Sequence, residues 1–148
     1  MRESISYTPW CAMCCTGMMP DELWGEQWWV GPNYIHIMGT KQEARDRKVP
    51  RICTPTMPLL RQPTTFNHAL TKATNGTVQP YDARRTFLHW MEEARITRTR
   101  RKIYAGHSVK DVTDLYERHE VAAYLETDAD LLREYLGEPR GGLKVVKA

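Results

Sequence analysis

The sequence predicts a single α+β domain that is mainly helical and has a small antiparallel β-sheet near its N-terminus. The chain has 148 residues, enough for one domain with its own hydrophobic core. Residues 27–52 contain short apolar segments divided by turn residues, a pattern typical of strands. Most other segments place apolar residues at helical spacing between capping and breaking residues.

The first half of the chain predicts two helices, the sheet and a loop. Residues 8–24 indicate a helix, a glycine break, and a second helix entered through Pro and Asp at 20–21. Two or three short strands follow, with Gly-Pro-Asn at 31–33 as one turn and the polar residues 41–47 as another. Residues 53–65 are rich in Pro and Thr and predict a loop.

The second half predicts a series of helices. Residues 138–148 show weak ordering signals, so we expect the domain to cover residues 1–137 and to be followed by a tail. The predicted helices are residues 66–76 (ending at Gly76), 81–94 (with Phe87, Leu88, Met91 and Ala94 on the apolar side), 97–104, a helix that opens near 108, and 128–136.

Positive charge is concentrated in one short segment, although the net charge of the chain is only +3. Residues 95–102, RITRTRRK, hold five cations and no acid, whereas residues 111–138 are rich in acids. A basic patch of this kind suits a polyanionic partner. The alternative interpretation is a solvated helix face.

The cysteines do not predict a metal site. Three of the four lie in the segment CAMCC and the fourth is Cys53, without the second C-x-x-C or the paired histidines of a zinc site. We expect buried thiols in a reducing compartment, and neither a metal nor a cofactor. The chain shows no secretion signal and no window of about 18 apolar residues, so we expect a cytoplasmic protein without a membrane span.

Tyr116 has a plain structural interpretation when it is taken alone. Ser108 and Asp111 form an S-x-x-D pattern that predicts a capping box at the start of a helix. An aromatic on the apolar stripe of such a helix is usually part of the core. The predicted stripe is Val112, Leu115, Tyr116, His119 and Ala123.

Four fragments in order change this interpretation. TGMMPDEL (16–23) resembles a T-G-x-R-x-x-E-L helix start, and GTKQEARDRKVP (39–50) a lysine-bearing β-hairpin that closes on Val-Pro. YDARRT (81–86) resembles an H-x-L-R-R-T box, and AGHSVKDVTDLY (105–116) an L-G-H-S box with a tyrosine nine residues after its histidine. Together, over about residues 8–137, the chain resembles the catalytic domain of tyrosine recombinases of the phage integrase type.

The resemblance implies a mainly helical recombinase fold that cleaves and rejoins DNA. In that chemistry a tyrosine attacks the phosphodiester and forms a phosphotyrosine, so the strands can be rejoined without ATP. Arginines hold the non-bridging oxygens, a lysine protonates the leaving oxygen, and a histidine adds a hydrogen bond. Matching positions assign these roles to Tyr116 (nucleophile), Arg84, Lys41, His107 and Tyr81 (phosphate contact), with Glu22 bracing the first arginine site and Arg85, Arg98, Arg100, Arg101 and Lys102 binding DNA.

Two positions depart from the family pattern. Met19 stands where the family has its first arginine, and a thioether offers neither charge nor a donor fork. No arginine occurs in residues 3–44 to replace it, so we expect Glu22 to lack its partner. Tyr81 stands in place of a histidine but keeps a hydrogen-bond donor. The resemblance also implies that the N-terminal clamp domain is absent and that the catalytic domain begins late.

Alternatives therefore remain open at this stage. Arg84 could be a surface cation, Lys41 an ordinary hairpin lysine, and His107 a helix cap. The chain could be a non-catalytic DNA-binding remnant of the same fold, or an unrelated helical DNA-binding regulator built around residues 97–104. The recombinase interpretation predicts double-stranded DNA as the partner, a homo-oligomer on that DNA, and an origin in a phage or another mobile element.

Overall fold

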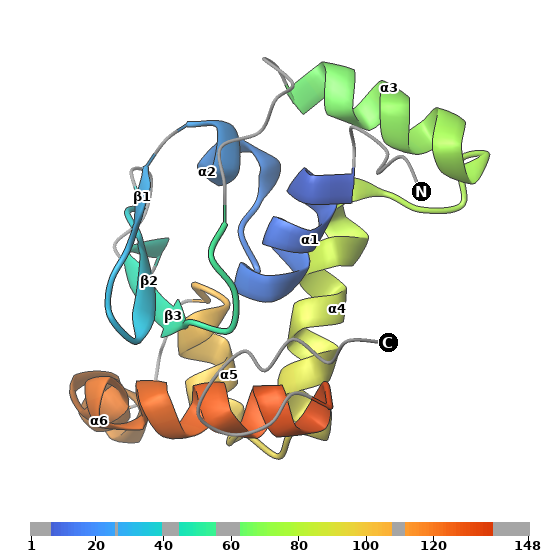
Figure 1. The fold of residues 1–148 in the computed structure, drawn as a ribbon. Helices are drawn as coiled ribbons and strands as arrows, with labels where there is room; N and C mark the ends of the chain where they lie inside the picture. Colours follow the sequence, from blue (N-terminus) through green and yellow to red (C-terminus); the bar gives the residue numbers. More distant parts are fainter. Residues whose placement is uncertain (1–6, 26, 40–44, 56–62, 108–111, 138–148) are drawn as a thin grey trace.

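The computed structural model describes residues 7–25, 27–39, 45–55, 63–107 and 112–137, although the side chains of residues 7–8 and 112–120 lie outside that description. In Figure 1 the three-stranded sheet stands beside helices α1 and α2, with α4, α5 and α6 arranged around the remaining sides of the core. The described residues confirm a mainly helical α+β fold with one small antiparallel sheet.

The N-terminal helices follow the sequence signals. Helix α1 covers Tyr7–Thr16 and α2 covers Pro20–Trp24. They are separated at Gly17, whose φ of +68° is a left-handed conformation that favours glycine. A Cβ at this glycine would lie 2.4 Å from a ring carbon of Phe87. Gly17 therefore allows both the turn and the close packing of α1 on α4.

The sheet has the predicted antiparallel form. Strands β1 (Trp28–Val30), β2 (Tyr34–Ile37) and β3 (Arg47–Pro50) pair in the order β1-β2-β3. The register places Ile35 opposite Val49 and Ile37 opposite Arg47. These four side chains are buried, whereas Lys48 between them on β3 is exposed. The alternation follows from the two-residue period of a strand.

The later helices confirm most of the predicted elements. They are α3 (Pro63–Thr74), α4 (Pro80–Glu93), α5 (Arg98–Tyr104) and α6 (Val112–Tyr135). The predicted loop 53–65 was too long by three residues, because α3 begins at Pro63, a favourable first helical position. Gly76, with φ of +72°, follows the end of α3 as expected.

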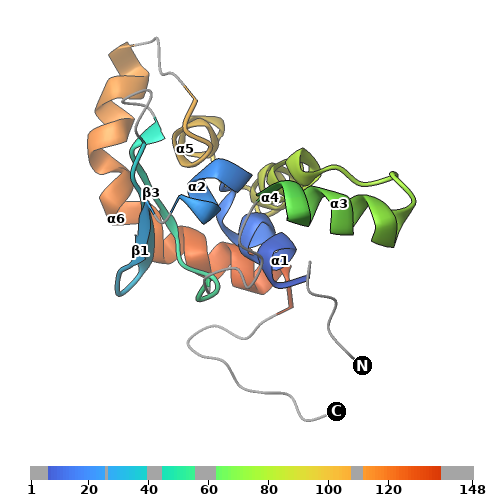
Figure 2. The same cartoon turned by 90° about the horizontal axis from the view of Figure 1, so that it is seen from above.

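The C-terminal region differs from the prediction. Residues 112–135 form one helix rather than two, and Figure 2 shows that α6 changes direction along its length. The predicted apolar stripe was wrong at Ala123, which is exposed, because the face of α6 that meets the core carries Val121, Leu125, Ala129 and Leu132. The expected capping box at Ser108 and Asp111 lies outside the described residues.

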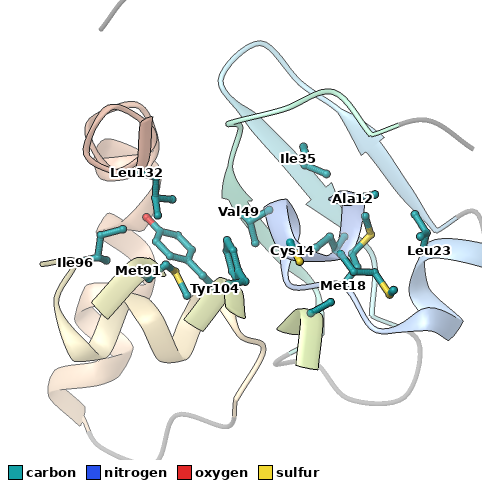
Figure 3. Packing of buried hydrophobic residues seen from close by; sticks show 14 of the residues in the cluster. Ala12, Cys14, Met18, Leu23, Ile35, Val49, Met91, Ile96, Tyr104 and Leu132 are labelled. Carbon is teal, nitrogen blue, oxygen red and sulfur yellow. The ribbon is translucent and has the colours of Figure 1, made fainter. Parts of the chain in front are cut away.

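One hydrophobic cluster joins the helices to the sheet. Figure 3 shows side chains of α1, the sheet, α5 and α6 meeting in this core. Tyr104, Phe66 and Phe87 are its largest fully buried aromatic side chains. No helix in the described part of the chain is both long enough and apolar enough to span a membrane.

Candidate nucleic-acid interface

A buried arginine and a buried glutamate join the sheet to the helices. Arg47 on β3 faces the core with Val49, and its side chain is only 1% exposed. Its Nη1 and Nη2 donate to the two carboxylate oxygens of Glu22 at 2.9 and 3.1 Å. Its Nε donates to the carbonyl of Tyr104 at 2.9 Å. The guanidinium of Arg47 therefore connects β3, α2 and the end of α5.

The expectation that Glu22 lacks a cationic partner was wrong. Arg47 lies just beyond the segment 3–44 in which a replacement arginine was sought, and the fold brings it to Glu22. Met19 is the N-cap of α2, and its backbone N–H donates to Glu22 Oε2 at 2.8 Å. Glu22 thus caps its own helix and also neutralises Arg47.

Arg84 is buried rather than a surface cation. It lies on α4 and is 8% exposed. Its Nη1 donates to the carbonyl of Gly17 at 3.0 Å, and its Nη2 donates to the carbonyl of Ala105. These bonds tie α4 to the α1–α2 turn and to the C-cap of α5. In this conformation Arg84 therefore acts as a cross-link between segments.

The buried charges do not balance locally. Burial lowers the pKa of Arg84, and the nearby guanidinium of Arg47 lowers it further. Burial alone would raise the pKa of Glu22, but hydrogen bonds from Arg47 and its charge outweigh burial and hold that pKa below its ordinary value. Two guanidiniums against one carboxylate leave an excess of positive charge at this point.

His107 lies next to this positive charge. It lies three residues beyond the end of α5, is largely exposed, and its backbone N–H donates to the carbonyl of Lys102 at 3.0 Å. Partial burial lowers the pKa of its imidazole, and the charges of Arg84, Arg47 and Lys102 lower it further. The imidazole is therefore neutral at pH 7 and can accept a proton if an anion binds beside it.

A basic groove runs between α4 and α5 and includes His107. Its cavity has a volume of about 470 Å³. The described residues that line it include four cations and one acid, Glu92, which forms an ion pair with Arg101 at 3.1 Å. The lining residues are Arg85, Leu88, His89 and Glu92 from α4, Arg98, Arg101 and Lys102 from α5, and His107.

The structure groups some of the predicted site residues and separates others. Arg85, Arg98, Arg101, Lys102 and His107 line the groove. Arg84 and Glu22 lie close enough to interact electrostatically, and Arg84 also acts on His107. Tyr81 is 43% exposed on α4, with the guanidinium of Arg85 over its ring at 5.2 Å.

Arg100, Lys41 and Tyr116 stand apart from the groove or outside the description. The guanidinium of Arg100 donates to the fully buried carboxylate of Asp128 at 2.8 and 3.1 Å. This contact connects α5 to α6. Lys41 lies outside the described residues. The backbone of Tyr116 is part of α6, but its side chain is outside the description.

Sequence reasoning missed Arg47, His89 and Glu92. A signal for Arg47 was present, because it precedes the apolar Val49 by two residues and a strand places such residues on one face. A cation on a buried face requires an acid, and Glu22 was available. His89 and Glu92 gave no comparable signal, because their importance depends on the way α5 packs against α4.

Comparisons of the chain with protein families, with curated proteins and with solved structures found no match. An assignment of function therefore rests on the geometry of the buried cluster and of the groove, together with the motif resemblance in the sequence.

The ion pair predicts an acid-sensitive stability. Glu22→Gln should lower the free energy of unfolding at neutral pH by about 3 kcal/mol, because Arg47 would remain buried without a counter-charge. The folded-state pKa of Glu22 is below its ordinary value of 4.5, so its contribution is complete above that pH and is lost as pH falls through the lowered pKa. The difference from wild type should therefore shrink below about pH 4.5 in chemical denaturation.

Asp21→Asn provides the matched control, since Asp21 is an exposed carboxylate on the same helix. It should change the unfolding free energy by less than about 1 kcal/mol at neutral pH. A Glu22→Gln difference that stays constant from about pH 7 to about pH 3 would show that the Glu22 charge is not the source of the stabilisation.

Proposed function

We propose that the protein binds double-stranded DNA through the groove between α4 and α5. The observation that carries this proposal is that, among the described residues, four cations and His107 line one groove together with a single acid. Phosphate contacts supply most of the non-specific affinity for DNA, and Arg and Lys are the residues that make them. The mild net charge of +3 is thus less relevant than its distribution.

The packing of the groove supports phosphate binding. Arg98, Arg101 and Lys102 are spaced i, i+3 and i+4 on α5, so they share one face of that helix. Thr97 caps the helix by accepting from the N–H of Arg100. Helices that are tied into the core hold charged side chains in register more exactly than a loop does. A rigid duplex therefore meets an organised row of donors.

The resemblance to tyrosine recombinases favours DNA over other polyanions. Four of the five residues predicted to bind DNA line the groove, and so does the predicted histidine. Arg100 is the exception, and we exclude it from the proposed interface because Asp128 holds its guanidinium. The same resemblance implies a phage or mobile-element origin, and with it the cytoplasm of a bacterial host as the location of the protein.

Strand cleavage and rejoining through a phosphotyrosine is the second candidate function. The observation that favours it is that Arg47, Arg84 and His107 lie close enough for the two guanidiniums to lower the pKa of the imidazole. Arg47 forms the ion pair with Glu22 that Met19 cannot form. In this reaction Tyr116 would be the nucleophile, Lys41 would protonate the leaving oxygen, and several copies would act together on DNA.

The burial of both guanidiniums makes DNA binding the first proposal and cleavage the second. Arg47 and Arg84 donate to protein acceptors, and neither side chain is appreciably exposed. Stabilising a pentavalent phosphorane requires donors within about 3 Å of its oxygens. Arg84 would have to exchange a carbonyl of Gly17 or Ala105 for a phosphate oxygen before it could take this role.

Neutralising the groove should weaken DNA binding in a salt-dependent way. Arg98→Gln with Lys102→Gln removes two phosphate contacts, so the slope of log affinity against log salt should become shallower by about 1.8. The control is Lys48→Gln with Lys72→Gln, which removes the same charge from exposed lysines outside the groove. Fluorescence anisotropy with a labelled duplex between about 50 and 200 mM salt measures both. Equal slopes for the two double variants would refute the proposed interface.

Protonation of His107 should strengthen DNA binding at acid pH. A bound phosphate raises the pKa of His107 above its lowered free value, so binding takes up a proton and affinity rises as pH falls between the two values. The gain should be roughly ten-fold for each unit by which the pKa rises. The pH dependence of DNA affinity should be measured for His89→Gln and for His89→Gln with His107→Gln. Both proteins lack the imidazole of His89, so they differ only at His107. Parallel pH profiles would show that His107 does not contact the phosphate.

Strand cleavage should depend on the hydroxyl of Tyr116. A pool of nicked duplexes of varied sequence should yield a covalent protein–DNA adduct with the wild type and none with Tyr116→Phe, while DNA affinity stays the same. Tyr124→Phe is the control, because Tyr124 is a 40% exposed tyrosine of the same helix. An adduct that persists in Tyr116→Phe would identify another nucleophile. No adduct with the wild type would leave DNA binding as the function.

A further inference from the structure

Glu92 is the one carboxylate among the described residues that line the α4–α5 groove. It lies on α4 and its Oε1 is 3.1 Å from Nη1 of Arg101 on α5. Its side chain is 64% exposed and that of Arg101 is 22% exposed, so the ion pair is at the opening of the groove. A negative charge here is unfavourable for a surface that binds a polyanion, since it repels phosphate and occupies a cation.

We propose that Glu92 is a resident competitor of the polyanion. Its carboxylate occupies Arg101, and binding requires Arg101 to exchange this intramolecular partner for a phosphate of the ligand. The inference rests on the proposed DNA-binding function and deepens it, because it states how the same groove is regulated. Arg85 shows a related arrangement, with Asp82 at 3.2 Å, but Asp82 lies outside the groove lining.

The exchange is physically accessible. An ion pair this exposed contributes little to stability, so a phosphate can replace the carboxylate at small cost. The displaced carboxylate nevertheless remains tethered to α4 within a few ångströms of the bound phosphate, where it still competes. The net effect is an affinity lower than the cations alone would produce, by roughly three- to ten-fold.

The arrangement also predicts which anions the groove prefers. A single phosphate gains few contacts when Arg101 is already neutralised. A polyanion contacts Arg98, Lys102 and Arg85 at the same time. These contacts offset the binding energy that is lost at Arg101. Glu92 therefore favours ligands with repeated, closely spaced phosphates over isolated anions, and it keeps the complex with DNA readily reversible.

The test is a double-mutant cycle on duplex affinity. Glu92→Gln should raise affinity at moderate salt by roughly three- to ten-fold, since Arg101 then contacts a phosphate without first releasing a carboxylate. Glu93→Gln is the matched control, because Glu93 is the next residue on α4, exposed and outside the groove lining. It should change affinity by less than about two-fold.

Repeating Glu92→Gln in an Arg101→Gln background separates competition for Arg101 from general repulsion. If Glu92 acts by occupying Arg101, the gain should fall to less than half on a logarithmic scale. A gain that is undiminished in this background, or equal gains for Glu92→Gln and Glu93→Gln, would overturn the proposal.

Heparin-column elution distinguishes failure of this inference from failure of the DNA proposal. Glu92→Gln should elute at higher salt than the wild type, and Arg98→Gln with Lys102→Gln at lower salt. If this order holds but no duplex binds, DNA is the wrong polyanion and the role of Glu92 stands. If duplex binds and Glu92→Gln changes neither measurement, only the inference about Glu92 falls. If neither probe binds, both proposals fall.

Discussion

The bidentate ion pair between Arg47 and Glu22 is the interaction on which the remaining arrangement depends. Burying two charges is costly, and the cost is recovered only when the geometry is good and the other donors are satisfied. Here the guanidinium also donates to the carbonyls of Tyr104 and Arg45. The pair therefore aligns the strand β3 with α2 and with the end of α5. Arg84 and His107 lie near this ion pair, close enough to interact electrostatically with Arg47.

Two faces of helix α5 make different contacts: one packs against α6, and the other lines the groove. Arg100 and Tyr104 turn toward α6, where the buried carboxylate of Asp128 accepts from both, and the guanidinium of Arg100 also stacks on Tyr124 at 4.2 Å. Arg98, Arg101 and Lys102 line the groove instead. The same basic segment therefore supplies a structural cation, Arg100, and the cations of the proposed binding groove. Their roles are separated by helical periodicity, because Arg100 is one or two residues from each groove cation, and residues at these spacings do not face each other on a helix.

The two buried guanidiniums are the reason why we propose DNA binding first and strand cleavage second. Arg47 and Arg84 raise the local positive potential without presenting their donors to solvent. A positive potential favours the approach of an anion and lowers the pKa of His107. Catalysis additionally requires hydrogen-bond donors within reach of the oxygens of the reacting phosphate. The proposed binding in the groove therefore needs no rearrangement of these two buried side chains, whereas the proposed cleavage does.

The sequence by itself determined the short strands, the helices around Gly17 and Gly76, and the clustering of cations in residues 95–102. These depend on local rules: a two-residue or 3.6-residue period, capping residues, and glycine at positive φ. Only the tertiary structure decided that Arg47 partners Glu22, that Ala123 faces solvent, and that Arg100 leaves the basic face while Glu92 joins it. Each of these depends on which face of an element meets a neighbour distant in the chain. Helix packing and buried charge pairing decide that choice, and local sequence does not encode them.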